Sequence, residues 1–381
     1  MEPSSARAPW RAIVVAALAC LQPGIDPVFL TLLSQAGGLP AQTHGWIVGA
    51  TQGGMAIGAL LVWRRRPFLP RRASLFAALV AIVAAIATGV ARDLAAMLAI
   101  RATFGVAMGI VYTEAMGAAA ATHPTRSYAT VFLSQLLLST VTALALPTLS
   151  HAAGARATLL ALALVPLVVA LLVAGAPSVV REEAPRGVAR ATSPIAWALA
   201  LATFAFICAT MMVWSSAGAL ATDHGFDAGA IGVAVAIGSI TGAATALAMM
   251  RERRRWPLPL TGLAASACLL APLVLTPLGD RTLFVGAIVL LNIGSTAIII
   301  RCSGAAAAAS DDAVFRRFVA CTHPLGMIAG PLAGAGLTAL AGVSGLAGGA
   351  LASLACGCGA LLVGAGAPSL SRYPEKTRSA A

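Results

Sequence analysis

Long apolar runs alternate along the chain with short stretches rich in arginine, proline, glycine and acidic residues. A helix needs roughly 20 mainly apolar residues to cross a bilayer, and most of these runs reach that length. The strands of a membrane barrel would be shorter and would alternate apolar with polar residues. The pattern therefore predicts membrane helices over residues 11–33, 44–63, 73–91, 94–119, 127–149, 157–175, 195–221, 229–250, 258–278, 282–305, 315–340 and 344–366.

The composition supports membrane insertion of the whole chain. Of the 381 residues, 59% are hydrophobic and 10% are charged, and the mean hydropathy is +0.90. Soluble domains average about 25% charged residues, because a surface that faces water needs polar cover. The predicted fold class is therefore an all-α integral membrane protein with twelve transmembrane helices.

Basic residues set the predicted orientation. They gather in every second connecting segment, whereas the segments between hold only Arg92, Arg156 and Arg281. Because Lys and Arg accumulate on the cytoplasmic side of membrane proteins, we expect a multi-pass protein of the cytoplasmic (inner) membrane with both termini in the cytoplasm. The net charge of +12 is then a topology signal that faces anionic lipid, and we expect no nucleic-acid partner.

The longest polar break, residues 176–194, separates two sets of six predicted helices. Each set has an arginine cluster after its second helix, at Arg64–Arg66 and at Arg253–Arg255, which indicates a duplicated unit. We therefore expect two pseudo-symmetric six-helix bundles. The predicted boundaries are an N-terminal bundle over 1–175, a cytoplasmic central loop over 176–194, a C-terminal bundle over 195–366 and a cytoplasmic tail over 367–381.

Charged residues inside predicted spans are the strongest pointers to function, because each costs at least roughly 2.5–3.5 kcal/mol at the centre of a membrane helix unless it is compensated. Asp26 lies eight residues before Ser34 and Arg101 lies eight residues after Asp93, so each is about 12 Å below the predicted outer edge. Gln52, eight residues after His44, lies at a similar depth. Our hypothesis is an Asp26–Arg101 charge pair in which Asp26 titrates and couples protons to transport. A static pair that only orients two helices is the alternative.

The segment from Gln22 to Pro27 contains two prolines and a glycine beside Asp26. Proline removes a backbone donor, so we expect the first helix to be broken here and its carbonyls to be freed for hydrogen bonding. A broken helix beside a charge is a common design for a transport site. A kink without function is the alternative.

Further polar residues complete the predicted site. Glu114 lies about 31 Å along its helix, near the predicted cytoplasmic face, where it and Tyr112 are candidates for a gate. Arg301 has a similar depth, and we expect its charged head to extend toward the interface. Histidine titrates near physiological pH, so His323 is a further candidate, with a hydrogen bond to a carbonyl as the alternative. The remaining candidates for lining a substrate cavity are Gln52, Gln135, Trp214, Ser215, Asn292 and Ser295.

Two sequence patterns resemble motifs of the major facilitator superfamily (MFS). Arg101 is followed by Gly105 and Gly109, similar to the fourth-helix motif of that family. Gly58 and the basic residues after Trp63 resemble its pattern between the second and third helices, with Val62 where the family has an aspartate.

A third pattern, Gly326-Met-Ile-Ala-Gly330-Pro331, is similar to the fifth-helix motif of MFS proton antiporters. It lies in the eleventh predicted span instead, where it indicates close helix packing.

The resemblance implies a fold of two six-helix bundles around a central cavity that is lined by the first and fourth helices. It also implies that Arg101 faces this cavity and takes part in proton or substrate coupling. An acidic residue in the first span together with the Arg101 motif is similar to drug–proton exporters of the family, although the fifth span lacks the antiporter motif. The resemblance implies a monomer.

We therefore expect a secondary active transporter that moves a small organic solute by alternating access, with proton-coupled efflux favoured. A proton-coupled uptake symporter for a small organic anion attracted by Arg101 is the alternative, and a membrane enzyme or sensor is a third class. The sequence has no Walker A, HExxH or GxSxG motif, so we predict neither an enzyme nor a cofactor or metal site. The expected partners are a small-molecule substrate, protons and membrane lipid.

Overall fold

The computed structural model describes residues 10–37, 39, 43–63, 70–121, 123–175, 192–226, 228–251 and 256–365. The predicted tail over 367–381 and most of the predicted loop over 176–194 lie outside these described residues, as do the arginine clusters 64–66 and 253–255. Every regular element in the described ranges is a helix, which confirms the all-α prediction.

The first half of the chain follows the predicted spans closely. The predicted helices over 44–63 and 94–119 coincide with α3 and α5, whereas the first and sixth spans are each divided into two helices. The helices of this half are α1 (Trp10–Ala19), α2 (Gln22–Gly37), α3 (His44–Trp63), α4 (Arg71–Val90), α5 (Leu94–Ala119), α6 (Pro124–Ala153), α7 (Ala155–Ala161) and α8 (Leu164–Ala174).

The second half contains longer helices. Its elements are α9 (Pro194–Asp223), α10 (Ala228–Arg251), α11 (Leu258–Leu275), the short 3₁₀ turn η2 (Thr276–Leu278), α12 (Arg281–Ala308) and α13 (Ala313–Ala365). The last of these covers both predicted spans over 315–340 and 344–366.

A sharp break divides α13 into two arms. Ala341 has non-helical dihedral angles, and Gly342 has a φ of 61°, a left-handed value that glycine adopts without steric cost. Gly345 and Gly349 both lie against Leu337, so the second arm folds back along the first. The polypeptide therefore reverses direction within α13, as two successive spans require.

Ten helices in the described part of the chain are long and apolar enough to cross a membrane. Large apolar side chains cover their outer surfaces; Phe76 on α4 and Leu263 on α11, for example, are 69% and 65% exposed. Such a surface is stable in hydrocarbon and unfavourable in water. The chain is therefore a multi-pass membrane protein.

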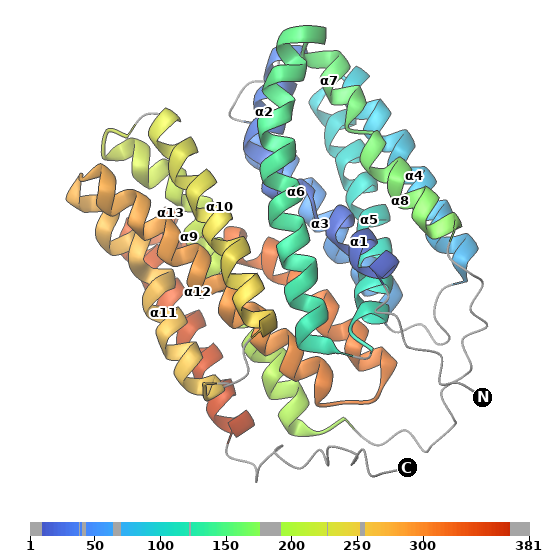
Figure 1. Cartoon of the computed structure of the whole chain (residues 1–381). Coiled ribbons are helices and arrows are strands. Elements are labelled where there is room, and N and C mark those ends of the chain that lie inside the picture. Colours follow the sequence, from blue (N-terminus) through green and yellow to red (C-terminus); the bar gives the residue numbers. More distant parts are fainter. Residues whose placement is uncertain are drawn as a thin grey trace, which may run out of the picture.

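The helices of the two halves lie on opposite sides of the molecule, and their ribbons diverge toward one end (Figure 1). We call the other end, where α5 and α12 end and α6 and α13 begin, the basic end, because the predicted arginine-rich segments belong to it. Contacts between the halves occur there and at mid-height. Thr125 of α6 lies against Gly304 of α12 near the basic end, and Leu136 lies against Gly242 at mid-height.

Candidate functional site

The first predicted span is broken, but just before the Gln22–Pro27 segment in which its prolines predicted the break. Helix α1 ends at Ala19 and α2 begins at Gln22, so that Cys20 and Leu21 form the break. Pro23 lies in the first turn of α2, a position where its missing N–H costs no intrahelical hydrogen bond. The backbone N–H of Gly24 donates to the Leu21 carbonyl (3.1 Å), which closes the turn between the two helices.

Asp26 lies one turn into α2, directly after this break. The Gln22 side chain donates from Nε2 to Asp26 Oδ1 over 2.8 Å, an (i, i+4) contact along one face of the helix. The carboxylate is half-buried. The broken helix therefore holds an oriented acidic group inside the first half of the protein.

Arg101 is almost completely buried, with 2% of its surface exposed. Its guanidinium lies between the rings of Phe29 and Phe104, with Cζ at 4.6 Å and 4.5 Å from the two ring centroids. Aromatic faces attract cations, so these rings partly offset the loss of water. Nε donates to Thr51 Oγ1 over 3.1 Å, while Nη2 has no hydrogen-bond partner among the described residues.

Four glycines bring Thr51 to this arginine. Gly54 and Gly58 of α3 lie directly against the backbone of α5, and Gly105 and Gly109 of α5 lie against the backbone of α3. A Cβ at any of the four would collide with a carbonyl of the facing helix. Small residues allow two membrane helices to approach at backbone distance. The glycines after Arg101 therefore fix its depth relative to α3.

Asp26 and Arg101 both lie within the first half of the protein, on α2 and α5. No hydrogen bond or salt bridge joins them directly among the described contacts; the direct partner of Asp26 is Gln22, and that of Arg101 is Thr51. Gln52 is 3% exposed, and its Oε1 is buried without a hydrogen-bond partner in the described part of the chain.

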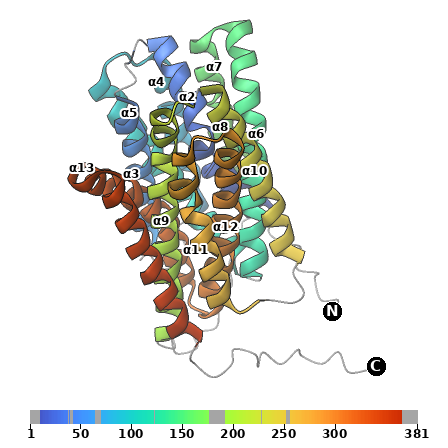
Figure 2. The same ribbon diagram turned by 90° about the vertical axis from the view of Figure 1, so that its left-hand side faces the viewer.

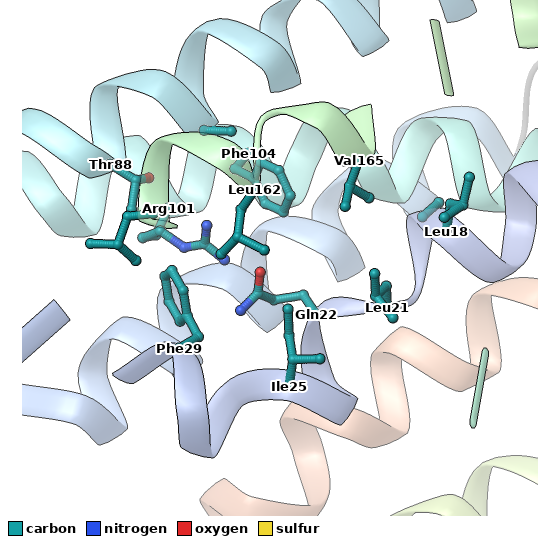
Figure 3. A pocket seen from close by; sticks show the side chains of 13 residues that line it. Leu18, Leu21, Gln22, Ile25, Phe29, Thr88, Arg101, Phe104, Leu162 and Val165 are labelled. Atoms are coloured by element: carbon teal, nitrogen blue, oxygen red, sulfur yellow. The ribbon is translucent and has the colours of Figure 1, made fainter. Parts of the chain in front are cut away.

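A small cavity lies between the helix break and Arg101 (Figure 3). It holds about 20 Å³ of space for the centres of water-sized molecules, enough for a water or two. Gln22 and Arg101 face it from opposite sides, and Ile25, Phe29 and Phe104 supply apolar walls. The cavity lies within the first half of the molecule, so it is a place for water beside the charges, and it is too small for an organic solute.

A second buried charge pair joins the two halves near the basic end. Arg317 Nη1 of α13 donates to Glu114 Oε1 of α5 over 3.1 Å, and the two side chains are 1% and 10% exposed. Glu114 lies 13 residues beyond Arg101 on α5, or about 20 Å along the helix. Arg317 lies near the start of the predicted span over 315–340, inside α13, with its charge turned toward Glu114.

Aromatic rings surround this pair. Phe318 of α13 lies 4.8 Å from the Trp63 ring and 4.9 Å from the Trp197 ring, between the ends of α3 and α9. Deeper in the protein, the His323 ring contacts Phe132 at 5.4 Å and Tyr112 at 6.1 Å. These rings come from both halves, so together with the ion pair they form a continuous layer between them.

Cys321 adds a polar contact to this layer. Its thiol donates to the Ala59 carbonyl of α3 over 3.2 Å and is fully buried. Arg317, Phe318 and Cys321 all lie near the start of α13, and each contacts a residue of the first half.

The remaining predicted cavity residues are less connected. Asn292 donates to the Ile288 carbonyl over 2.9 Å, and the Ser295 hydroxyl donates to the Asn292 carbonyl over 3.3 Å, so both bond their own helix α12. Trp214 is half-buried on α9, Ser215 is exposed and bonds the Met212 carbonyl, and Gln135 is half-buried on α6. The structure thus distributes these residues over three helices without a shared hydrogen-bond network among the described contacts.

Sequence reasoning missed Thr51, Phe29 and Phe104 as the immediate surroundings of Arg101, and Arg317 as the partner of Glu114. The pairing of Arg317 with Glu114 could have been expected from their depth in the membrane. Arg317 lies four residues into α13 and Glu114 five residues before the end of α5, so both are about 6–8 Å from the basic end. In the described residues, no group of three or more His, Cys, Asp or Glu side chains is placed to hold a metal ion.

No protein-family model and no curated protein matches the chain. Solved structures match its fold over nearly its whole length. The human organic anion transporter MFSD10 (TETRAN) has a TM-score of 0.68 at 16% identity, covering 92% of this chain and 97% of that one.

Two further solved structures agree. The MFS transporter FucP in its outward conformation has a TM-score of 0.66 at 14% identity, with 93% and 98% of the two chains covered. A bacterial homologue of the iron transporter ferroportin, in an outward-facing state, has a TM-score of 0.68 at 14% identity, with 94% and 99% covered. At these identities the likeness establishes the fold, and the fold of this chain is that of the major facilitator superfamily transporters.

Proposed function

We propose that the protein is a secondary active transporter that exports a small organic solute across the cytoplasmic membrane in exchange for protons. The broken α1–α2 segment forms the first span and the two arms of α13 form the last two, which gives twelve spans in two bundles with both termini in the cytoplasm. The protein acts as a monomer, with a cavity between the bundles that opens to one side of the membrane at a time.

The observation that carries the proposal is the buried Glu114–Arg317 ion pair between the halves. A solute that passes between the bundles must separate this pair, because α5 and α13 meet there. Removing one partner of a buried ion pair typically costs about 3–5 kcal/mol, because the remaining charge is left buried without its partner. Opening of the basic end therefore requires both charges to gain water or other partners. The closed layer at the basic end and the diverging ribbons at the other end support an outward-facing state.

Asp26 and Arg101 supply the proposed coupling. When Asp26 is ionised it attracts Arg101, and when it is protonated that attraction is lost. Arg101 can then turn toward the cavity between the bundles or toward a solute. Its two aromatic neighbours and Thr51 hold it within reach of both positions. The proposed path for protons to the carboxylate passes through water in the small cavity lined by Gln22, the hydrogen-bond partner of Asp26.

Arg101 also favours a second candidate function, proton-coupled uptake of a small organic anion. A buried guanidinium with Nη2 lacking a hydrogen-bond partner in the described part of the chain is a suitable donor to a carboxylate. MFSD10, whose solved structure is similar, is an organic anion transporter. The two functions differ in the direction in which protons move relative to the solute.

Proton flux in proteoliposomes tests the proposal. The purified protein is reconstituted with a pH-sensitive dye inside, and organic cations, neutral compounds and carboxylates are added in turn. Export by exchange predicts proton movement opposite to the solute, and uptake by symport predicts movement with it. Asp26→Asn is expected to abolish solute-dependent proton flux, because an amide does not titrate.

Asp280→Asn is the matched control. Asp280 caps the first turn of α12 through Oδ1, which accepts from the Leu283 N–H over 2.8 Å, and asparagine caps a helix equally well. This variant is expected to retain full coupling. Proton flux that survives in Asp26→Asn at the level of the Asp280→Asn control would remove Asp26 from the mechanism.

A further inference from the structure

An open groove lies on the surface of the second half, near the basic end. It has about 530 Å³ of space, within the roughly 300–1,000 Å³ typical of small-molecule sites. Helices α10 and α11 each pack against α12 and make few contacts with one another, so α12 forms the floor of the groove between them. Both ribbon views show α12 between the other two helices (Figures 1 and 2).

Small side chains keep the groove open. Ala248 of α10, Ala264 of α11 and Ala297 of α12 line it, and the first two are exposed. Leu260 and Leu263 on α11, next to the groove, are 47% and 65% exposed. Because α11 presents these leucines outward, the groove opens on the surface that faces lipid.

One end of the groove is polar. The Arg301 guanidinium of α12 donates to the Thr261 hydroxyl and to the Trp256 carbonyl, which hold it at the edge of α11. The Trp256 ring is 61% exposed at the same edge. Tryptophan rings of this kind prefer the headgroup level of a bilayer. Thr261 is three residues into α11, so this end lies about 5 Å from the helix terminus.

We propose that this groove binds an anionic phospholipid of the leaflet at the basic end. Arg301 and the Thr261 hydroxyl bind the phosphate of the headgroup, Trp256 packs beside the glycerol, and one acyl chain lies in the alanine-lined channel. A guanidinium carries a permanent charge and presents its N–H donors in a planar fork, the geometry that suits a phosphate. Basic pockets between membrane helices on the cytoplasmic side are suited to such headgroups.

Charge complementarity favours a lipid over a soluble ligand. The site combines one cation, an interfacial tryptophan and an apolar channel that is open to hydrocarbon along its length. A soluble phosphate would gain nothing from the alanine channel.

Lipid retention measured by native mass spectrometry tests the proposal without any transport assay. The full-length protein is released from nanodiscs that contain phosphatidylglycerol and phosphatidylethanolamine in equal amounts. The wild type is expected to retain phosphatidylglycerol preferentially. Arg301→Gln is expected to lower the ratio of the two retained lipids about fivefold, the effect of one arginine at a membrane surface. Ala264→Phe fills the channel and is expected to lower retention of both lipids.

Arg281→Gln provides a matched control, because Arg281 is an exposed arginine at the opposite end of the same helix. It is expected to leave the lipid ratio unchanged. Two results would overturn the proposal: equal ratios in the wild type and Arg301→Gln, or displacement of the bound lipid by inorganic phosphate. If Arg301→Gln fails to fold, Ala264→Phe decides alone, since undiminished retention in that variant excludes the groove.

Discussion

Two helix pairs in the two halves share one geometry and differ in chemistry. In the first half α5 packs against α3, and in the second half α12 packs against α10. Both α5 and α12 begin with a capping aspartate, Asp93 and Asp280, whose side chain accepts from the backbone N–H three residues later. Counted from the starts of α3 and α10, Gly54 and Gly58 correspond to Gly238 and Gly242. The first two glycines face α5, and the second two face α12.

The residues that differ are those that carry charge. Counted from the capping aspartates, Arg101 corresponds to Ile288, which is 1% exposed in an apolar cluster. Thr51, the hydrogen-bond partner of Arg101, corresponds to Val235. Thus the repeat preserves the crossing of the helices, and of these four described helices only α5 has an ionisable group at this depth. In the proposed mechanism the first half therefore performs the coupling, and the second half supplies a surface that moves against it.

The largest expected effect comes from the contact that joins the halves. Glu114→Gln leaves Arg317 without the carboxylate it pairs with, and loss of one partner of a buried pair costs about 3–5 kcal/mol. The basic end should then open more often and expose Cys321, which is fully buried at the interface with α3. Maleimide labelling followed by mass spectrometry is expected to show at least about tenfold faster modification of Cys321.

Cys302 is the internal control for this experiment, because it is fully buried within the second half, near Cys358. Its labelling rate should not change. Replacing both partners, as in Glu114→Leu with Arg317→Met, removes both charges and should melt at a higher temperature than the single variant. Unchanged labelling of Cys321 in Glu114→Gln would mean that the pair does not hold the basic end closed.

A smaller effect is expected from the glycines of the two helix pairs. A Cβ at Gly105 collides with the backbone of α3, which cannot move aside, so Gly105→Ala should destabilise the protein by about 3 kcal/mol. A Cβ at Gly238 instead meets the Asn292 amide at 2.6 Å, and that side chain can rotate, so Gly238→Ala should cost about 1 kcal/mol. Thermal unfolding of the two purified variants measures both losses of stability. Equal losses would show that the α3–α5 and α10–α12 crossings tolerate a Cβ equally well.

The smallest expected effects come from removing single hydrogen bonds, one to a charged group and one within a helix. Thr51→Val removes the acceptor of Arg101 Nε and should cost about 2 kcal/mol, since hydrogen bonds to charged groups are worth about 1.5–3 kcal/mol. Ser295→Ala removes only a bond to its own helix and should change stability by less than about 0.5 kcal/mol. The same unfolding assay measures both variants, and a larger loss in Ser295→Ala would place an unrecognised partner at that site.

Most of the fold could be predicted from the sequence, because hydrocarbon imposes a simple rule on each helix. Apolar runs of sufficient length mark where the chain crosses, and α3 and α5 have the predicted ends. The break before Gln22 also followed from local chemistry, since Pro23 cannot donate a backbone hydrogen bond. These features depend on residues that are close together in the chain.

Contacts between helices could not be predicted in the same way. Hydropathy gives the depth of a residue but not the rotation of its helix, so the pairing of Arg317 with Glu114 could not be predicted from the span over 315–340 alone. For the same reason the depth of Asp26 and Arg101 indicated a pair, whereas the structure gives each of them a different direct partner. The proposed roles of Gln135, Trp214, Ser215 and His323 depend on such rotations too, and they remain predictions.

Alternating access is the central claim, and distances measured across both ends of the molecule test it most directly. Spin labels at Ala121 and Asp311 span the basic end, and labels at Ala153 and His224 span the other end; all four positions are exposed. The labels are introduced after replacement of the seven native cysteines, in nanodiscs. For Glu114→Gln we predict a longer distance across the basic end together with a shorter distance across the other. Distances that stay the same at both ends in the wild type and in Glu114→Gln would contradict the account.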